Sequence, residues 1–224
     1  MDNKIKKMIL TAIFAAMSVL LYLFPKFSLP IFPSFLEMNF SMLPIVICGF
    51  SCGAMYGGIC VLLRYLSNLI IEGSITAGVG EIMDLMLGGA VVIISGLLYS
   101  KLKLKEPKKS IIALVCCMFT WVISGVILNI FYAIPLYLKL YFNGNENALV
   151  GALHIIPGVT TSNYMFKYVL YAVIPFNLIL SGVVLIITFF VNKAIYILYD
   201  DEKVDEKDAI DEVEADESDN NETA

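Results

Sequence analysis

The chain has 224 residues, of which 59% are hydrophobic and only 16% are charged, and its formal net charge is −5. Soluble globular domains are about 45–50% apolar and about 25% charged, so this composition argues against a soluble cytosolic enzyme. A disordered body is excluded too, because disordered chains are poor in hydrophobic residues, and we expect an all-α integral membrane protein whose body is one domain.

Five uncharged stretches are candidates for membrane spans, because a transmembrane helix needs about 20 predominantly apolar residues. The second uncharged stretch is Met38–Leu63, and the run from Pro44 to Ile71, which includes Arg64, is too long for one simple span and has four glycines near its middle. We predict two short helices there, joined by a tight glycine turn, with a single kinked helix as the alternative. The predicted transmembrane bundle then has six helices, over residues 7–24, 43–53, 55–72, 80–101, 110–135 and 168–198.

Lysines indicate how these helices are oriented. Three lysines lie in residues 4–7, at the start of the first helix, and five lie in residues 101–109, around the end of the fourth, whereas the loops on the other side, 25–42, 73–79 and 136–167, are sparsely basic. By the positive-inside rule, the N-terminus and the lysine-rich loop are cytoplasmic. With six helices the C-terminus is cytoplasmic as well, whereas five would place it outside.

The first helix carries small residues on one face. Ala12 and Ala16 form a small-xxx-small pair, and Ala15 lies beside them. Such faces let a second helix approach closely in lipid. The sequence leaves open whether this face packs inside the same bundle or docks onto another subunit.

Motifs for catalysis and metal binding are missing from the sequence. No phosphate-binding loop of the form G-x-x-x-x-G-K-[ST] occurs, so the chain is not a primary pump on its own. The single histidine, His154, falls in a predicted outer loop and cannot form a Ser-His pair inside the membrane. The five cysteines lie in apolar stretches without metal-ligand spacing. We therefore expect no catalytic residue, no metal, no cofactor and no nucleic-acid partner.

A few polar residues lie at membrane depth, where an ionisable group costs about 2.5–3.5 kcal/mol to insert and so marks a candidate functional site. Glu81 opens the fourth helix, where the macrodipole favours its carboxylate. Asn129 and Asn177 lie at the same outer level on the fifth and sixth helices. Three such groups can converge on a ligand, although each alone is explained by an interhelical hydrogen bond. Further polar residues at membrane depth are Arg64, Asn68 and Asp84.

Aromatic residues gather near the same level. They form either an interfacial belt or the walls of a pocket for a flat ring system. A mostly apolar cavity with a few polar anchors is typical of a small-molecule site, and glycines such as Gly80 would let a ligand approach closely. The aromatic residues are Phe32, Phe35, Phe40, Phe131, Tyr132, Tyr137, Tyr164 and Phe176.

The C-terminal segment differs in composition from the body. Residues 200–224 hold 13 acidic and two basic residues, a net charge of −11, which leaves +6 on the body. Such a composition is typical of a solvated, disordered segment. We expect a six-helix membrane domain over 1–199 and a disordered, acidic, solubilising cytoplasmic tail over 200–224.

Four segments together resemble a known family: FLEMNFSMLPIVICGF (35–50), GVGEIMDLMLGG (78–89), NIFYAIPLY (129–137) and IPFNLILSG (174–182). They are similar to the riboflavin-specific substrate-binding (S) components of energy-coupling-factor (ECF) transporters, which are bacterial vitamin importers. The resemblance covers nearly the whole body. It implies a six-helix S component of the bacterial cell membrane that captures riboflavin at the extracellular side, with FMN or a flavin analogue as a further candidate.

The resemblance also implies partners and site residues. S components do not hydrolyse ATP. They associate with an ECF module of one membrane coupling (T) subunit and two cytoplasmic ATP-binding subunits, docking through an alanine-rich face of helix one that Ala12, Ala15 and Ala16 match. The family's flavin-binding Glu and two Asn residues correspond to Glu81, Asn129 and Asn177. The remaining candidate ligand contacts are Asn39, Phe40, Gly80 and Asp84.

Several positions depart from the family pattern, and other functions stay open. The departures are Leu180 in place of Lys, Asn39 and Met42 in place of a first-loop Asp, Arg64 in place of Glu, and Asp84 in place of Asn. They leave another vitamin as an alternative ligand. A self-sufficient ion-coupled carrier using Arg64, Glu81 and Asp84 as a relay is a second alternative, and a structural membrane protein without a ligand is a third.

Overall fold

The computed structural model of the chain describes residues 3–74, 76–104 and 108–194. The chain separates into two compact units, 1–188 and 189–224, and the first unit holds the bundle of helices and the candidate site. The predicted acidic tail over 200–224 and the last residues of the predicted sixth helix lie outside the described residues.

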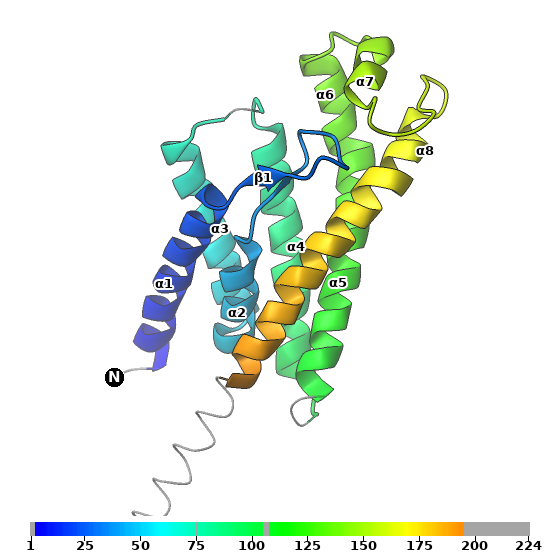
Figure 1. Cartoon of the computed structure of the whole chain (residues 1–224). Coiled ribbons are helices and arrows are strands. Elements are labelled where there is room, and N and C mark those ends of the chain that lie inside the picture. The colour runs from blue at the N-terminus through cyan, green and yellow to red at the C-terminus, as the bar shows by residue number, and fades with distance from the viewer. Residues whose placement is uncertain (1–2, 75, 105–107, 195–224) are drawn as a thin grey trace, which may run out of the picture. The chain divides into compact units, whose positions relative to one another are not determined.

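The first three helices pack against one another (Figure 1). They are α1 (Asn3–Leu23), α2 (Met42–Cys52) and α3 (Ala54–Ile71). Helix α1 ends just before Phe24-Pro25, because a residue that precedes proline disfavours the α conformation. The chain then forms a short antiparallel hairpin of β1 (Phe27–Ser28) and β2 (Glu37–Met38).

Gly53 separates α2 from α3 with φ of +101°, in the left-handed region that favours glycine. The two helices then run back along each other, and a Cβ added at Gly57 would lie 3.1 Å from the Cα of Gly49. The predicted pair of helices is therefore confirmed over the single kinked helix. With 11 residues, α2 rises only about 16 Å, and it is buried on nearly all sides.

The rest of the first unit is built around α4 (Val79–Lys101), which packs on α3 and on α5 (Lys108–Leu128). Two π-helical turns interrupt the helices that follow. The elements after α5 are η1 (Asn129–Ala133), α6 (Ile134–Leu140), α7 (Glu146–Ala152), α8 (Tyr164–Tyr168), η2 (Val169–Val173) and a helical run over 174–194.

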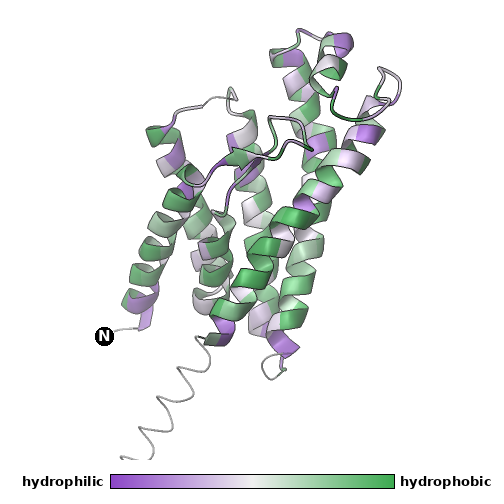
Figure 2. Cartoon of the chain, viewed as in Figure 1, coloured by the Kyte–Doolittle hydropathy of each residue, from purple (hydrophilic) through white to green (hydrophobic). Residues whose placement is uncertain are grey.

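Five helical runs among the described residues are long and apolar enough to cross a membrane, and α2 is an additional shorter apolar helix. Their outward faces carry large apolar side chains, such as Leu20 and Ile70 on the first helices and Phe119 on α5. Apolar residues cover the middle of the helices of the first unit, and hydrophilic residues gather near their ends (Figure 2). Exposed apolar surface on this scale is typical of a membrane protein. The runs are Asn3–Leu23, Ala54–Ile71, Val79–Lys101, Lys108–Leu140 and Tyr164–Ala194.

Replacing Gly96 by alanine is expected to lower the free energy of unfolding by about 1–3 kcal/mol. A Cβ at Gly96 would lie 2.5 Å from the Cα of Ala54, so α3 and α4 would have to move apart. Gly89 of the same helix is the matched control, because a Cβ there meets nothing within 4 Å. Thermal unfolding in detergent should show a lower midpoint for Gly96→Ala alone. Equal midpoints would contradict the close contact.

Candidate functional site

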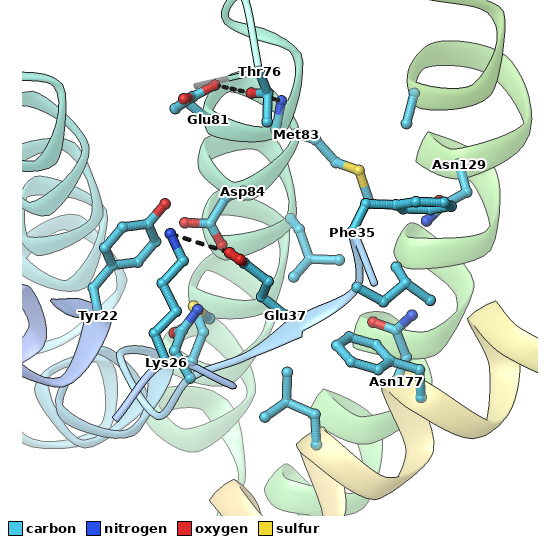
Figure 3. A pocket seen from close by; sticks show the side chains of 18 of the residues that line it. Tyr22, Lys26, Phe35, Glu37, Thr76, Glu81, Met83, Asp84, Asn129 and Asn177 are labelled. Carbon is cyan, nitrogen blue, oxygen red and sulfur yellow. Dashed lines mark hydrogen bonds and ion pairs between the residues drawn. The ribbon is translucent and has the colours of Figure 1, made fainter. Parts of the chain in front are cut away.

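A cavity of about 340 Å³ lies between the β1–β2 hairpin and the surrounding helices (Figure 3). Its volume falls within the range of about 300–1,000 Å³ that is usual for small-molecule sites. Side chains from α1, the hairpin, the α3–α4 connection, α4, the run Lys108–Leu140 and the run that begins at Tyr164 all line it. Segments far apart in the sequence therefore meet around one space.

Six of the seven ligand contacts suggested by the sequence line this cavity: Asn39, Gly80, Glu81, Asp84, Asn129 and Asn177. Phe40, which we also expected there, is half-buried and is not among the lining residues. Three of the aromatic residues that the sequence placed at this level contribute to the wall, namely Phe35, Tyr137 and Phe176. Phe131 is 77% exposed and points away from the bundle interior.

The two asparagines are placed by a feature that their helices share. Each π-helical turn ends two residues before a proline: η1 ends at Ala133 before Pro135, and η2 ends at Val173 before Pro175. Proline has no N–H to donate, and its ring clashes with the carbonyl one turn earlier. We attribute the wider turns to these prolines. Turns of this kind are frequent at functional sites; here Asn129 opens η1, and Asn177 follows Pro175 by two residues.

Hydrogen bonds hold both amides in one orientation. Each donates from Nδ2 to the main-chain carbonyl one turn earlier, at 2.8 Å. The Oδ1 of Asn129 accepts from the Tyr168 hydroxyl at 2.8 Å, and the Oδ1 of Asn177 accepts from Trp121 Nε1 at 3.1 Å. An amide has two N–H groups and two lone pairs, so each side chain keeps one donor and one acceptor site beyond these bonds. The pair can therefore anchor a polar ligand edge without rearranging.

Trp121 and Tyr168 were not predicted as site residues, although both are 1% exposed and both line the cavity. Trp121 is 56 residues from its partner Asn177, and Tyr168 is 39 residues from Asn129. Only the folded helices bring these pairs together. The one available signal was that Trp121 is the single tryptophan of the chain, and its indole N–H requires a partner when it is buried.

The opposite side of the cavity is charged (Figure 3). The Nζ of Lys26 lies 3.1 Å from Glu37 Oε2 and 3.6 Å from Glu72 Oε2. These two ion pairs join the loop after α1 to β2 and to the end of α3. Burial alone would lower the pKa of Lys26, but the hydrogen bond to Glu37 and the nearby carboxylates outweigh it and raise the pKa above its ordinary value. Lys26 is therefore cationic at neutral pH. Glu81 accepts a hydrogen bond from the Thr76 hydroxyl.

Arg64 supports this charged side from behind. Its side chain is fully buried, and its Nη2 lies 2.5 Å from Asp84 Oδ2 in the cavity wall. Its Nη1 donates to the Ser41 hydroxyl at 2.6 Å, and that hydroxyl donates to Asn39 Oδ1 at 2.7 Å. Arg64, which the sequence marked as a departure from the family pattern, therefore links α3 to α4 and to the segment that precedes α2.

Only part of the alanine face predicted on α1 is exposed in the structure. Ala12 and Ala16 are exposed on the outside of the first unit, whereas Ala15 is only 6% exposed and packs inside it. Ala12 and Ala16 are four residues apart and therefore lie on one face of the helix. Ala15 is three residues after Ala12 and lies about 60° from it around the helix axis. Ala12 and Ala16 are thus free to contact a neighbouring helix, and Ala15 is not.

Comparison with known proteins identifies the family. The model for the substrate-specific component of ECF transporters matches residues 6–192. The riboflavin transporter RibU of Streptococcus thermophilus is 30% identical over 190 residues, covering 82% of this chain and 79% of that protein. RibU of Leuconostoc mesenteroides is 29% identical over 203 residues (86% and 92%), and RibU of Lactococcus lactis subsp. cremoris is 28% identical over 179 (78% and 85%).

A solved structure described as the S component of a bacterial ECF transporter has the same fold. It superposes with a TM-score of 0.66 at 23% identity and covers 88% of this chain and 99% of that one. The mostly helical fold, with five candidate membrane spans among the described residues, is consistent with that of an S component. The chain belongs to the family of substrate-specific components of ECF transporters.

Proposed function

We propose that this chain is the riboflavin-capturing subunit of an ECF importer. The observation that carries the proposal is the two-sided cavity, in which Asn129 and Asn177 are held ready on one side and carboxylates lie on the other. Aromatic walls suit a flat ring, and carboxylates and amides suit the uracil-like edge and the ribityl hydroxyls. The RibU relatives from the three bacteria are all described as riboflavin transporters.

The proposal includes a topology and a set of partners. The lysines at the start of α1 and those at the end of α4 and the start of α5 lie at one end of the bundle, which the positive-inside rule makes cytoplasmic. The hairpin that lines the cavity lies toward the other end (Figure 1). With α2 counted as a sixth membrane helix, both termini are cytoplasmic in the bacterial cell membrane. Ala12 and Ala16 then face a membrane coupling subunit, which two cytoplasmic ATPases drive.

The single tryptophan makes riboflavin binding directly measurable. Trp121 lines the cavity, so a flavin bound there should quench its emission in proportion to occupancy. We expect titration of the detergent-purified chain with riboflavin to give saturable quenching at near-equimolar stoichiometry, and a preparation that retains ligand to be yellow. A colourless protein that shows neither quenching nor calorimetric binding heat would rule riboflavin out.

Replacing Asn177 by alanine should weaken riboflavin binding by roughly 1–3 kcal/mol, about 5- to 150-fold, because a buried hydrogen bond to the ligand is lost. Asn147, an exposed residue of α7 outside the cavity lining, is the matched control. Calorimetric titration should show a higher Kd for Asn177→Ala only. An unchanged Kd would remove Asn177 from the ligand contacts.

The dependence on partners separates this proposal from a self-sufficient carrier. Vesicles that hold the chain alone should bind riboflavin without accumulating it, and accumulation should appear when the coupling subunit, both ATPases and internal ATP are added. Accumulation by the chain alone would favour the carrier instead.

A further inference from the structure

The charged side of the cavity has more negative than positive groups. Among the described residues, four carboxylates line the cavity and Lys26 is the one cation that does. Arg64 behind the wall balances Asp84, and Lys26 balances one of the two carboxylates that it contacts. Two negative charges remain without a counter-charge. The four carboxylates are those of Glu37, Glu72, Glu81 and Asp84.

Lys26 is not available to an incoming anion. Its ammonium group already lies within 4 Å of both Glu37 and Glu72, and its side chain is only 20% exposed. Glu37 and Glu72 are more exposed than Lys26, at 48% and 28%. An anion that approached Lys26 would therefore meet the two carboxylates at close range as well. Figure 3 shows Lys26 and Glu37 at the centre of this side, with Asp84 above them.

We propose that the carboxylates of Glu37 and Glu72 make this site select uncharged, hydroxyl-bearing ligands and reject their phosphate esters. The inference rests on the proposed riboflavin binding and decides against FMN, which the sequence left as a further candidate. A phosphate monoester carries about −1.5 to −2 charges at pH 7, and placing like charges together suppresses the wrong partner. Hydroxyl groups, in contrast, donate hydrogen bonds to carboxylates.

The test is a calorimetric titration of the full chain with riboflavin and with FMN. At low ionic strength we expect riboflavin to bind at least about tenfold more tightly than FMN, and we expect added salt to narrow the difference because it screens the repulsion. The double substitution Glu37→Gln with Glu72→Gln should also narrow the difference in affinity between riboflavin and FMN, because this variant loses two negative charges and frees Lys26 from its ion pairs. Glu146→Gln removes one exposed carboxylate of α7 outside the cavity lining and should leave the ratio of the two Kd values unchanged.

The possible outcomes distinguish charge repulsion from other reasons for weak FMN binding. If FMN binds the unaltered chain as tightly as riboflavin, the inference is wrong while the proposed function stands. If FMN binds more weakly but neither salt nor the glutamine substitutions change the ratio, the shape of the cavity excludes the phosphate and the inference is again wrong. If neither flavin binds, the proposed function fails and the inference fails with it.

Discussion

Replacing Asp84 by alanine is expected to lower the free energy of unfolding by about 3–5 kcal/mol, because it leaves a buried guanidinium without its counter-charge. Arg64 is 0% exposed, and Asp84 is the carboxylate that it contacts, at 2.5 Å. Its bond to Ser41 satisfies one N–H but supplies no negative charge. Unfolding in detergent followed by circular dichroism measures the loss. Glu146→Ala, which removes an exposed carboxylate from α7, is the matched control.

The same ion pair can be removed as a unit. Breaking a buried pair from one side costs more than replacing both partners by apolar groups of similar size. The double variant Arg64→Met with Asp84→Leu should therefore recover much of the stability lost in Asp84→Ala, and a double-mutant cycle through the two single variants should show strong coupling. If Asp84→Ala proves as stable as Glu146→Ala, another group balances the positive charge of the Arg64 guanidinium, and Asp84 is not the counter-charge on which Arg64 depends.

This pair also joins two residues that the resemblance marked as separate departures from the family pattern, 20 residues apart in the sequence. The structure shows that the cation Arg64 and the anion Asp84 contact each other. Either charge alone would be unpaired in the bundle. Together the two residues keep the interior electrically balanced.

The helices were largely predictable because their signals are local. Runs of apolar residues set the spans, and the glycines around Gly53 indicated a turn. The parts that were missed depend on tertiary packing. The fifth helix was expected to end near 135, yet it continues through a π-helical turn to Leu140. A proline normally breaks a helix, and the sequence offers no signal that a wider turn will absorb it.

The candidate site was predictable in part for the same reason. Glu81, Asn129 and Asn177 were found because a polar residue in an apolar run is conspicuous, and all three line the cavity. Lys26 was not predicted as a site residue, because its contacts with Glu37 and Glu72 join segments 11 and 46 residues away. Contacts of that kind come from the hairpin folding over the helix ends, which spacing along one helix does not reveal.

Replacing Trp121 by alanine is expected to lower the free energy of unfolding by about 3–5 kcal/mol, because a large buried side chain is lost and a cavity remains. Trp121 is 1% exposed on α5, whereas Phe119, two residues earlier, is 59% exposed. Phe119→Ala is therefore a matched aromatic truncation that should cost far less. Thermal unfolding in detergent compares the two, and similar losses would contradict the inward position of Trp121.

Trp121→Phe separates the hydrogen bond of this residue from its volume. Phenylalanine retains most of the ring but has no N–H, so the Oδ1 of Asn177 loses the donor that fixes its amide. Leaving a buried acceptor unpaired costs about 1–3 kcal/mol, and the freed amide can rotate away from the ligand. Riboflavin affinity, measured by calorimetry because this variant lacks the tryptophan signal, should therefore fall in Trp121→Phe although the cavity stays filled. Unaltered affinity would show that the Nδ2 bond to the carbonyl of Val173 orients Asn177 without help, and the indole would then act through its bulk alone.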